Sequence, residues 1–391
     1  MAGFLTAEEA ASELTRLSQQ YPRWMGPATA VATSREGRPI QLLCVTKDRE
    51  GCDGQSERPA VLYTALLHAR EPISLTCLLH FLRALLRRAE AGEAGAAALL
   101  GQRKLLFLPT VNPDGWAWNE RARPRGGGMK RKNGLRSCGR GVRPGPSDGV
   151  DLNRNFGYKW AYSRQTGSSA QGCDEEYRGK EPFSEPEARA VRDVATLHGV
   201  RAVLHWHGWG NSLAFPYSYD WRAALLGSEL DRYQALSPRS HAPRRARSDL
   251  DDERSRARAL AQEVSGAMTA RNGYARGRAW ESVGYHANGE ADDWGFGERG
   301  LLSLSLEVGS ARDGFWPSPS RIGALAAQSL WPAQLLAHRA GPVLQLHSLA
   351  LSDAMSGGAS LQLSVHNAGL GELYGAWQAS SRLHISHASG F

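Results

Sequence analysis

Hydrophobic residues along the chain fall into two patterns, short continuous apolar runs and longer stretches with apolar residues at helical spacing. The short runs predict buried strands at 60–67, 105–111, 200–206 and 301–306. The helical spacing predicts helices at 6–20, 73–86, 185–198, 253–270 and 319–338. A strand pair is predicted at 28–34 and 40–46, across the turn Arg35-Glu36-Gly37. Because strands and helices alternate, the chain is predicted to fold as an α/β sandwich.

The pattern changes after residue 340, which predicts a second, smaller unit. Short alternating runs follow at 343–351 and 359–366, separated by the Gly/Ser break Ser356-Gly357-Gly358. This predicts a small β-domain at 341–391, whose length of about 50 residues is short for a complete, stable sandwich. The other predicted domain, at 1–340, is long enough to bury a substantial core.

Composition is that of a soluble globular enzyme, with 41% hydrophobic and 22% charged residues. No apolar stretch reaches the roughly 18 residues that a membrane span requires. Residues 1–30 lack the basic start and apolar region of a signal peptide. The sequence therefore predicts no membrane span and shows no signal peptide: either the chain is a mature or trimmed product, or the protein stays inside the cell.

The formal charge is +8, from 47 basic and 39 acidic residues, and much of the basic excess lies at 121–143. This stretch has no aromatic residue, so it is interpreted as a solvated basic loop rather than a nucleic-acid site. Its Gly126-Gly127-Gly128 run lacks the Gly-Lys-Ser/Thr of a phosphate-binding loop. Neither a disulfide-dense scaffold nor a paired C-x-x-C metal site fits the five cysteines, Cys44, Cys52, Cys77, Cys138 and Cys173.

Histidine and glutamate at one corner of the predicted fold indicate a metal site. His68-Ala69-Arg70-Glu71-Pro72 joins the strand at 60–67 to the helix at 73–86, and Pro72 suits the first turn of a helix. Two neutral imidazoles and one carboxylate around Zn²⁺, with a fourth place left for water, are the ligand set of catalytic zinc peptidases. His68 and Glu71 alone are a weak signal, since such a pair also arises by chance at a surface corner.

The third metal ligand is expected from a strand end brought close by the sheet. Leu204-His205-Trp206-His207-Gly208 offers two histidines on one face of a strand. Their chemistry does not separate them, and a buried strand can also end in histidines that hydrogen-bond within the core. Glu307 follows the predicted strand at 301–306, and such a carboxylate is expected either in a structural ion pair or in a functional site.

Six sequence blocks follow one another along the chain: His68-Ala69-Arg70-Glu71, Asn112-Pro113-Asp114-Gly115-Trp116, Asp151-Leu152-Asn153-Arg154-Asn155-Phe156, 173–180, 285–294 and Leu306-Glu307-Val308-Gly309. In this order they resemble the carboxypeptidase A/B family of zinc metallocarboxypeptidases. His207 lies nine residues before Pro216-Tyr217, and Trp294 lies thirteen residues before Glu307, as in the family. The resemblance covers roughly residues 5–340 and favours His207 over His205.

The resemblance implies a mixed parallel/antiparallel central sheet flanked by helices, with one Zn²⁺ per chain held by His68, Glu71 and His207. It implies an enzyme that hydrolyses the C-terminal peptide bond of peptides or proteins and releases single amino acids. The expected partners are therefore peptide or protein C-termini, without nucleic acid or membrane, and the protein is expected to be a monomer. Only a few tens of residues precede the first predicted strands, so the large N-terminal pro-segment of digestive members is not expected in this sequence.

Two catalytic residues follow from the same resemblance. Glu307 is expected to act first as general base and then as general acid, and Arg131 to stabilise the oxyanion. Lys130 and Arg136 compete with Arg131 for this role, because the loop before residue 131 departs from the family pattern. By itself, Arg131 is one more charge in a basic loop.

Substrate binding is expected from five residues, Arg70, Asn153, Arg154, Tyr285 and Asp292. Arg154 with Asn153 is expected to bind the free C-terminal carboxylate, with Tyr285 closing over it as a lid. Asp292, two residues before Trp294, is expected on the floor of the specificity pocket, where it favours C-terminal Lys or Arg. The alternative is a salt-bridged loop residue that faces away. Asp293 is expected to be structural.

The resemblance further implies a disulfide between Cys138 and Cys173, an oxidising compartment and an extracellular location. Two alternative functions remain open. One is a carboxypeptidase-like binding protein with weak or no catalysis, although every expected residue is present. The other is a zinc hydrolase of specialised peptides, with glutamate tails or bacterial wall peptides as substrates, although the His-Ala-Arg-Glu form of the metal motif argues against deglutamylating relatives.

Overall fold

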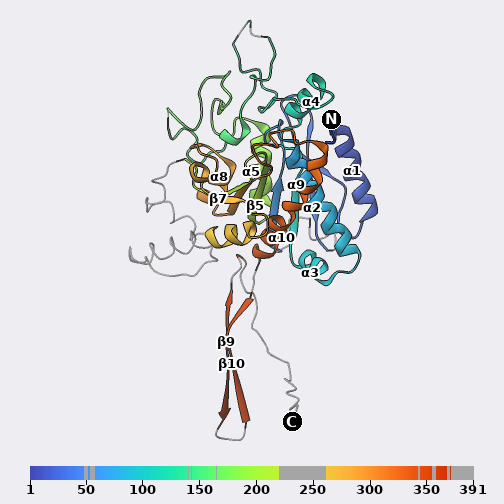
Figure 1. Ribbon diagram of the computed structural model, residues 1–391, viewed down its shortest axis with the longest axis vertical. Helices are drawn as coiled ribbons and strands as arrows, with labels where there is room; N and C mark the ends of the chain where they lie inside the picture. The colour runs from blue at the N-terminus through green and yellow to red at the C-terminus, as the bar shows by residue number, and fades with distance from the viewer. Residues whose placement is uncertain are drawn as a thin grey trace.

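The computed structural model describes residues 1–47, 52, 58–139, 141, 143–163, 165–219, 261–341, 344–354, 358–367 and 370. Its main body is built around an eight-stranded sheet (Figure 1). The strands are β1 (Thr29–Thr33), β2 (Pro39–Val45), β3 (Ala60–Thr64), β4 (Lys104–Leu108), β5 (Val200–His207), β6 (Ser212–Ala214), β7 (Ala275–Gly277) and β8 (Leu302–Glu307).

The sheet has the strand order β1-β2-β4-β3-β5-β8-β6-β7. Its central strands β4, β3, β5 and β8 are parallel, whereas β1 with β2, β2 with β4 and β6 with β8 pair antiparallel. β3 and β4 are buried along their whole length, which explains why they read as continuous apolar runs rather than as alternating ones. The predicted mixed sheet is confirmed.

Helices cover both faces of the sheet. On one face α1, α2, α9 and α10 pack over a core that includes Val61 and Tyr63 of β3. On the other face α5 and α8 pack over a core that includes Ala60 and Leu62 of the same strand. The helical elements are α1 (Ala7–Gln20), α2 (Pro72–Glu90), α3 (Ala94–Gln102), α4 (Pro113–Ala122), η2 (Leu152–Arg154), α5 (Pro186–Leu197), α7 (Ala279–Ser282), α8 (Ala291–Gly297), α9 (Pro319–Gln328) and α10 (Leu330–Arg339).

Two helices occupy the range predicted as one helix at 319–338. α9 ends at Gln328 and α10 begins at Leu330, with Ser329 between them. Pro332 accounts for the break, because it has no N–H to donate to the carbonyl four residues earlier. Of the helix predicted at 253–270, residues 261–269 are helical and 253–260 lie outside the described residues. The pattern did not predict α3 or α4.

The strands predicted at 60–67 and 105–111 end three residues earlier, at Thr64 and Leu108. Beyond Thr64 the chain leaves the sheet, and Leu66 adopts a positive φ of 51°. The amide of Val111 donates to the carbonyl of Ala65, so the two departing segments remain paired outside the ladder. This departure carries the chain to the corner at 68–71.

A long antiparallel hairpin follows the main body, formed by β9 (Leu344–Ala354) and β10 (Gly358–Asn367). Figure 1 shows it extending away from the sheet and its helices. The strands predicted at 343–351 and 359–366 correspond to this hairpin, while the domain boundary near residue 340 stays a prediction. Among the described residues, no helix is both long and apolar enough to cross a membrane.

Candidate metal centre and the surrounding cavity

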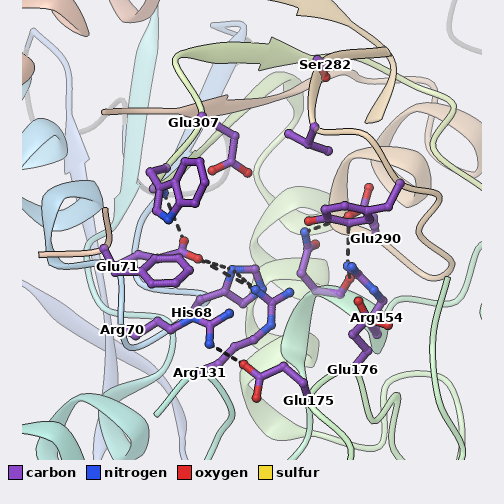
Figure 2. A pocket seen from close by; sticks show the side chains of 17 residues that line it. His68, Arg70, Glu71, Arg131, Arg154, Glu175, Glu176, Ser282, Glu290 and Glu307 are labelled. Atoms are coloured by element: carbon purple, nitrogen blue, oxygen red, sulfur yellow. Dashed lines mark hydrogen bonds and ion pairs between the residues drawn. The ribbon is translucent and has the colours of Figure 1, made fainter. Parts of the chain in front are cut away.

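The residues predicted to bind the metal and to catalyse hydrolysis lie at one edge of the sheet, at the carboxyl ends of three neighbouring parallel strands. β3 leads into the corner that holds His68 and Glu71, and Glu71 directly precedes α2. β5 ends at His207, and β8 ends at Glu307. His207 and Glu307 lie opposite each other in the parallel ladder. Because parallel strands end at the same edge, residues far apart in the sequence meet here (Figure 2).

His68, Glu71 and His207 form a compact, buried triad with exposed fractions of 4%, 3% and 1%. Nδ1 of His68 lies 2.9 Å from Oε1 of Glu71, and Nδ1 of His207 lies 3.1 Å from Oε2. The two Nδ1 atoms are 3.1 Å apart. One possible ligand atom from each residue lies within 4.8 Å of the others, so the three can bind one ion together.

The donors and acceptors around His68 indicate that the triad fits a cation. Nη1 of Arg131 lies 3.2 Å from Nδ1 of His68, and a guanidinium can only donate, so Nδ1 is an acceptor. The ring proton is therefore on Nε2, which donates to Oδ1 of Asp151 at 3.1 Å. Nδ1 of His68 and Oε1 of Glu71 are then two acceptors with no proton between them. Two imidazoles and a carboxylate that converge in this way suit Zn²⁺.

Glu71 is ionised in this arrangement. Burial raises the pKa of a carboxyl group, but the hydrogen bond and charge of His207 outweigh that effect and lower the pKa of Glu71 below its ordinary value. A backbone N–H at Gly208 also donates to Oε2 at 3.2 Å. The carboxylate is thus charged and oriented before any ion binds.

Asp151, which is fully buried, connects the triad to Arg131. Its Oδ1 accepts from His68 and from the backbone N–H of Asn153 at 3.1 Å, and its Oδ2 accepts from Nε and Nη2 of Arg131 at 2.9 and 2.7 Å. Burial raises the pKa of Asp151, but the charge of Arg131 and the hydrogen bond from His68 lower it well below its ordinary value. Sequence reasoning assigned Asp151 no role, and its signal was its place in the same motif as Asn153 and Arg154.

Arg131 is the candidate arginine that reaches the triad. Its Nη1 lies 3.9 Å from Oε1 of Glu71, and its guanidinium lines the cavity. Lys130 instead donates from Nζ to the carbonyl of Asp148 at 2.6 Å, and Arg136 forms an ion pair with the Asp148 carboxylate. Neither Lys130 nor Arg136 lines the cavity.

Glu307 lies partly buried on the cavity wall, and Figure 2 shows its side chain among those that line the cavity. Burial raises the pKa of Glu307 to about 8, against the opposing effect of the His207 charge. A dication at the triad lowers the pKa of a nearby carboxyl group. Metal binding therefore favours the ionised form of Glu307.

The cavity, of about 380 Å³, is also lined by four of the five residues predicted to bind substrate. Asn153 and Arg154 lie on the turn η2 and are 5% and 1% exposed. Tyr285 is 46% exposed, and its ring centroid lies 6.0 Å from Cζ of Arg154. Arg70 lies on the opposite wall, where it pairs with Glu175 and places its Cζ 4.2 Å from the centroid of the Phe315 ring.

Glu290 is a cavity residue that sequence reasoning missed. Its Oε1 accepts from Nη1 of Arg154 at 3.0 Å and lies 3.4 Å from Nδ2 of Asn153. The only signal in the sequence is its place between Tyr285 and Asp292. This spacing alone does not show that the side chain points toward Arg154.

Asp292 is 1% exposed and does not line this cavity. It accepts from Oγ of Ser305 at 3.2 Å and from the backbone N–H of Asp293 at 2.9 Å. Burial, followed by the charge of Glu290, raises the pKa of Asp292 to about 7. Its role on a pocket floor stays a prediction. Asp293 accepts two hydrogen bonds from the backbone N–H of Ser218, at 2.9 and 3.0 Å, which suits a structural residue.

His205 lies one pleat deeper than His207 and is a satisfied core histidine. Its Nδ1 lies 2.7 Å from Oγ1 of Thr64, and its Nε2 lies 3.5 Å from Oγ of Ser303. Burial lowers the pKa of His205 to about 3, so the ring is neutral. The third member of the triad is therefore His207.

Two disulfides are present. Cys138 is joined to Cys173, as the resemblance implied, and this bond ties the loop after Arg131 to the segment that carries Glu175. The second joins Cys44 to Cys52 and was not predicted. Cys77 is free and buried.

Comparison with known proteins matches residues 11–330 to the zinc carboxypeptidase family. Metallocarboxypeptidase A of Trichophyton tonsurans is 30% identical over 193 residues, which cover 48% of this chain and 41% of the relative. Carboxypeptidase B of Bos taurus is 33% identical over 210 residues, which cover 52% of this chain and 45% of the relative. The chain thus matches less than half the length of these curated relatives.

Solved structures match over more of the chain. Thrombin-activatable fibrinolysis inhibitor has a TM-score of 0.65 and 26% identity, over 86% of this chain and 74% of that one. The bovine protein in complex with tick carboxypeptidase inhibitor has a TM-score of 0.64 and 25% identity, over 86% and 97%. Since the family match spans most of the chain and the strand edge carries a His/Glu/His triad, this protein belongs to the zinc carboxypeptidase family.

Proposed function

We propose that the protein is a zinc-dependent carboxypeptidase that hydrolyses the C-terminal peptide bond of peptides or proteins and releases single amino acids. One observation carries the proposal. A single cavity is lined by the metal triad through His68 and Glu71, by the carboxylate of Glu307, and by the paired donors of Asn153 and Arg154. The first two suit peptide hydrolysis, and the third suits recognition of a free terminal carboxylate.

The metal triad, Glu307 and Arg131 each have a separate role in the proposed reaction. Zinc bound at the triad supplies a Lewis acid that polarises the scissile carbonyl and activates water. Glu307 accepts the proton of the attacking water and passes it to the leaving amine. Arg131 donates from Nη1 to the carbonyl oxygen as negative charge develops, because Asp151 holds its Nε and Nη2.

Recognition of the chain end restricts hydrolysis to the last peptide bond. Arg154 is almost fully buried, so its charge-assisted hydrogen bonds to a substrate carboxylate are made away from bulk water. Asn153 adds an amide donor beside it. Tyr285 is exposed at the cavity and is proposed to fold over the bound terminal residue.

A preference for C-terminal Lys or Arg is part of the proposal. The carboxylate of Glu290 lines the cavity beside Arg154, and Asp292 lies buried behind this lining, two positions further along the chain. Two acidic groups favour a cationic side chain. The same charges disfavour a terminal glutamate, which argues against glutamate tails as substrates.

A location in an oxidising compartment, outside the cell, is proposed from the two disulfides. The proposed partners are peptide and protein C-termini, bound by a monomer. Residues 341–391 are proposed to form a separate small β-domain, of which the hairpin β9–β10 is the described part.

The function is tested with N-blocked dipeptides that end in Lys, Arg, Phe, Leu or Glu, assayed with and without a zinc chelator. We expect release of single amino acids, fastest from Lys and Arg, loss of activity with the chelator and recovery with added Zn²⁺. Glu307→Gln is expected to keep zinc while kcat falls by at least about 100-fold. Stoichiometric zinc without hydrolysis of any dipeptide would support the carboxypeptidase-like binding protein instead.

Asp292 is tested in the same panel. Asp292→Ile is expected to reverse the order, so that Phe and Leu are released faster than Lys and Arg. Unchanged preference in this variant would show that Asp292 does not contribute to the specificity pocket.

A further inference from the structure

A carboxylate of the protein itself occupies the donors that are proposed to bind the substrate carboxylate. Oε1 of Glu290 lies 3.0 Å from Nη1 of Arg154 and 3.4 Å from Nδ2 of Asn153, and Figure 2 shows Glu290 directed at Arg154. Glu290 is 8% exposed and lines the cavity. The pair is therefore neither an exposed surface ion pair nor a contact sealed in the core, and a ligand in the cavity can reach it.

Within the described part of the chain, Arg154 is the one cation within ion-pair distance of Glu290. A substrate carboxylate that binds Arg154 therefore places a second anion on the same guanidinium. Leaving a buried carboxylate without a partner is costly, because the protein interior does not replace its hydration. Binding is favourable only if the substrate also brings a positive charge that pairs with Glu290 in place of Arg154.

We infer that Glu290 is a specificity-determining residue, which holds Arg154 and Asn153 in the free enzyme and pairs with the cationic side chain of a C-terminal Lys or Arg in the complex. This inference rests on the proposed carboxypeptidase function and names the residue that selects its substrates. A terminal Lys or Arg brings one anion to Arg154 and one cation to Glu290, so every charge stays paired.

Selection then acts mainly against the wrong substrates. A terminal Leu or Phe delivers the carboxylate but no cation, so Glu290 loses its partner and gains none. A terminal Glu adds a further anion and is the least favourable. Asp292, buried near Glu290, supplies no positive charge to relieve either case. The expected order is Lys or Arg, then neutral residues, then acidic residues.

The test is Glu290→Gln, assayed with N-benzoylglycyl dipeptides that end in Lys, Leu or Glu. Glutamine keeps the shape and an acceptor oxygen for Arg154 but removes the charge. KM for the Leu substrate is expected to fall about tenfold, and the ratio of kcat/KM for Lys over Leu to fall at least about tenfold, because a charge-assisted bond is replaced by a neutral one. Glu290→Ala, which adds no new contact, is expected to shift the ratio in the same direction and serves if the Gln variant does not fold.

Glu298→Gln is the matched control. Glu290 is the residue directly before α8, and Glu298 is the residue directly after it. Glu298 is exposed and does not line the cavity. The Lys over Leu ratio of this variant is expected to stay within about twofold of the unsubstituted enzyme, since a charge outside the cavity is screened by solvent.

Binding without turnover separates this inference from the proposed function. The same dipeptides are titrated by calorimetry into zinc-loaded Glu307→Gln, with and without Glu290→Gln. If the unsubstituted protein cleaves nothing but Glu290→Gln reduces the binding preference for Lys, the carboxypeptidase proposal fails and the inference holds. If the protein cleaves and the Lys over Leu ratio is the same with Glu and Gln at position 290, the inference is overturned and the function stands.

Discussion

Asp151→Asn is predicted to weaken zinc binding although Asp151 does not belong to the metal triad. Asp151 accepts hydrogen bonds from His68, from the amide of Asn153 and twice from Arg131. An asparagine has one acceptor oxygen and one NH₂ group, so it cannot serve both sides of this network. The charged Arg131 competes best for the oxygen, which turns the NH₂ group toward Nε2 of His68.

That orientation changes the tautomer of His68. With a donor facing Nε2, the ring proton is favoured on Nδ1, the nitrogen that faces Glu71 and the metal position. Zinc must then displace this proton. Loss of such an outer hydrogen bond lowers metal affinity about 10- to 100-fold, or about 1.4 to 2.8 kcal/mol. Arg131, only 7% exposed, also loses its carboxylate partner, which is expected to destabilise the fold by about 3 kcal/mol.

The assay is competition for Zn²⁺ against a chromophoric chelator, with circular dichroism to confirm that each variant is folded. Asp114→Asn is the control, because Asp114 is also fully buried and accepts from Ser34 and Arg38 at 2.7 Å, outside the cavity lining. It is expected to lose stability but keep zinc affinity. A folded Asp151→Asn variant that binds zinc within about twofold of the unsubstituted protein would refute the reasoning on the tautomer.

Two further predictions concern stability and covalent structure. Burial raises the pKa of Glu187 from 4.5 to about 7, so the native protein loses stability as pH rises from 4.5 through 7. Glu187→Gln removes this loss. Urea unfolding is therefore expected to show a free energy of unfolding about 3 kcal/mol higher in the variant near pH 8 and unchanged near pH 4. Cys138 and Cys173 are expected to resist alkylation in the native protein and to appear as one linked peptide in non-reducing mass mapping; free labelling of both would contradict the disulfide.

The central strands could be predicted from the sequence because burial on both faces leaves a continuous apolar run. The prediction at 200–206 is one residue shorter than β5, and the prediction at 301–306 is shifted by one residue from β8. Their order and direction in the sheet could not be predicted from the runs themselves, since any buried parallel strand has the same pattern. The mixed sheet was expected only through the resemblance.

The two histidines of β5 show why a site needs more than residue type. His205 and His207 are both histidines on the same face of the same strand, so their chemistry gave no reason to choose between them. In the structure the two histidines have different neighbours. The ring nitrogens of His205 lie within hydrogen-bond distance of the hydroxyl groups of Thr64 and Ser303, whereas His207 faces Glu71 and His68. These neighbours come from other strands and are not visible in the local sequence.

Long-range contacts also explain what the sequence did not predict. Glu290 matters because its carboxylate meets Arg154, 136 positions away in the chain. Asp151 matters because it lies between His68 and Arg131. The Cys44–Cys52 disulfide depends on where the chain returns after β2. Each contact is set by the packed fold, whereas the break between α9 and α10 was readable from Pro332 and was overlooked.

Arg131 and Arg154 each donate hydrogen bonds to one carboxylate, and the difference between these two pairs indicates their roles. Asp151 is fully buried and holds Arg131 through two bonds of 2.7 and 2.9 Å, so a ligand cannot replace it. Glu290 lines the cavity and accepts one bond of 3.0 Å from Arg154. We therefore expect an incoming carboxylate to displace Glu290 and not Asp151. Arg131 stays fixed beside the metal position, and Arg154 is the arginine whose partner can be exchanged for a substrate.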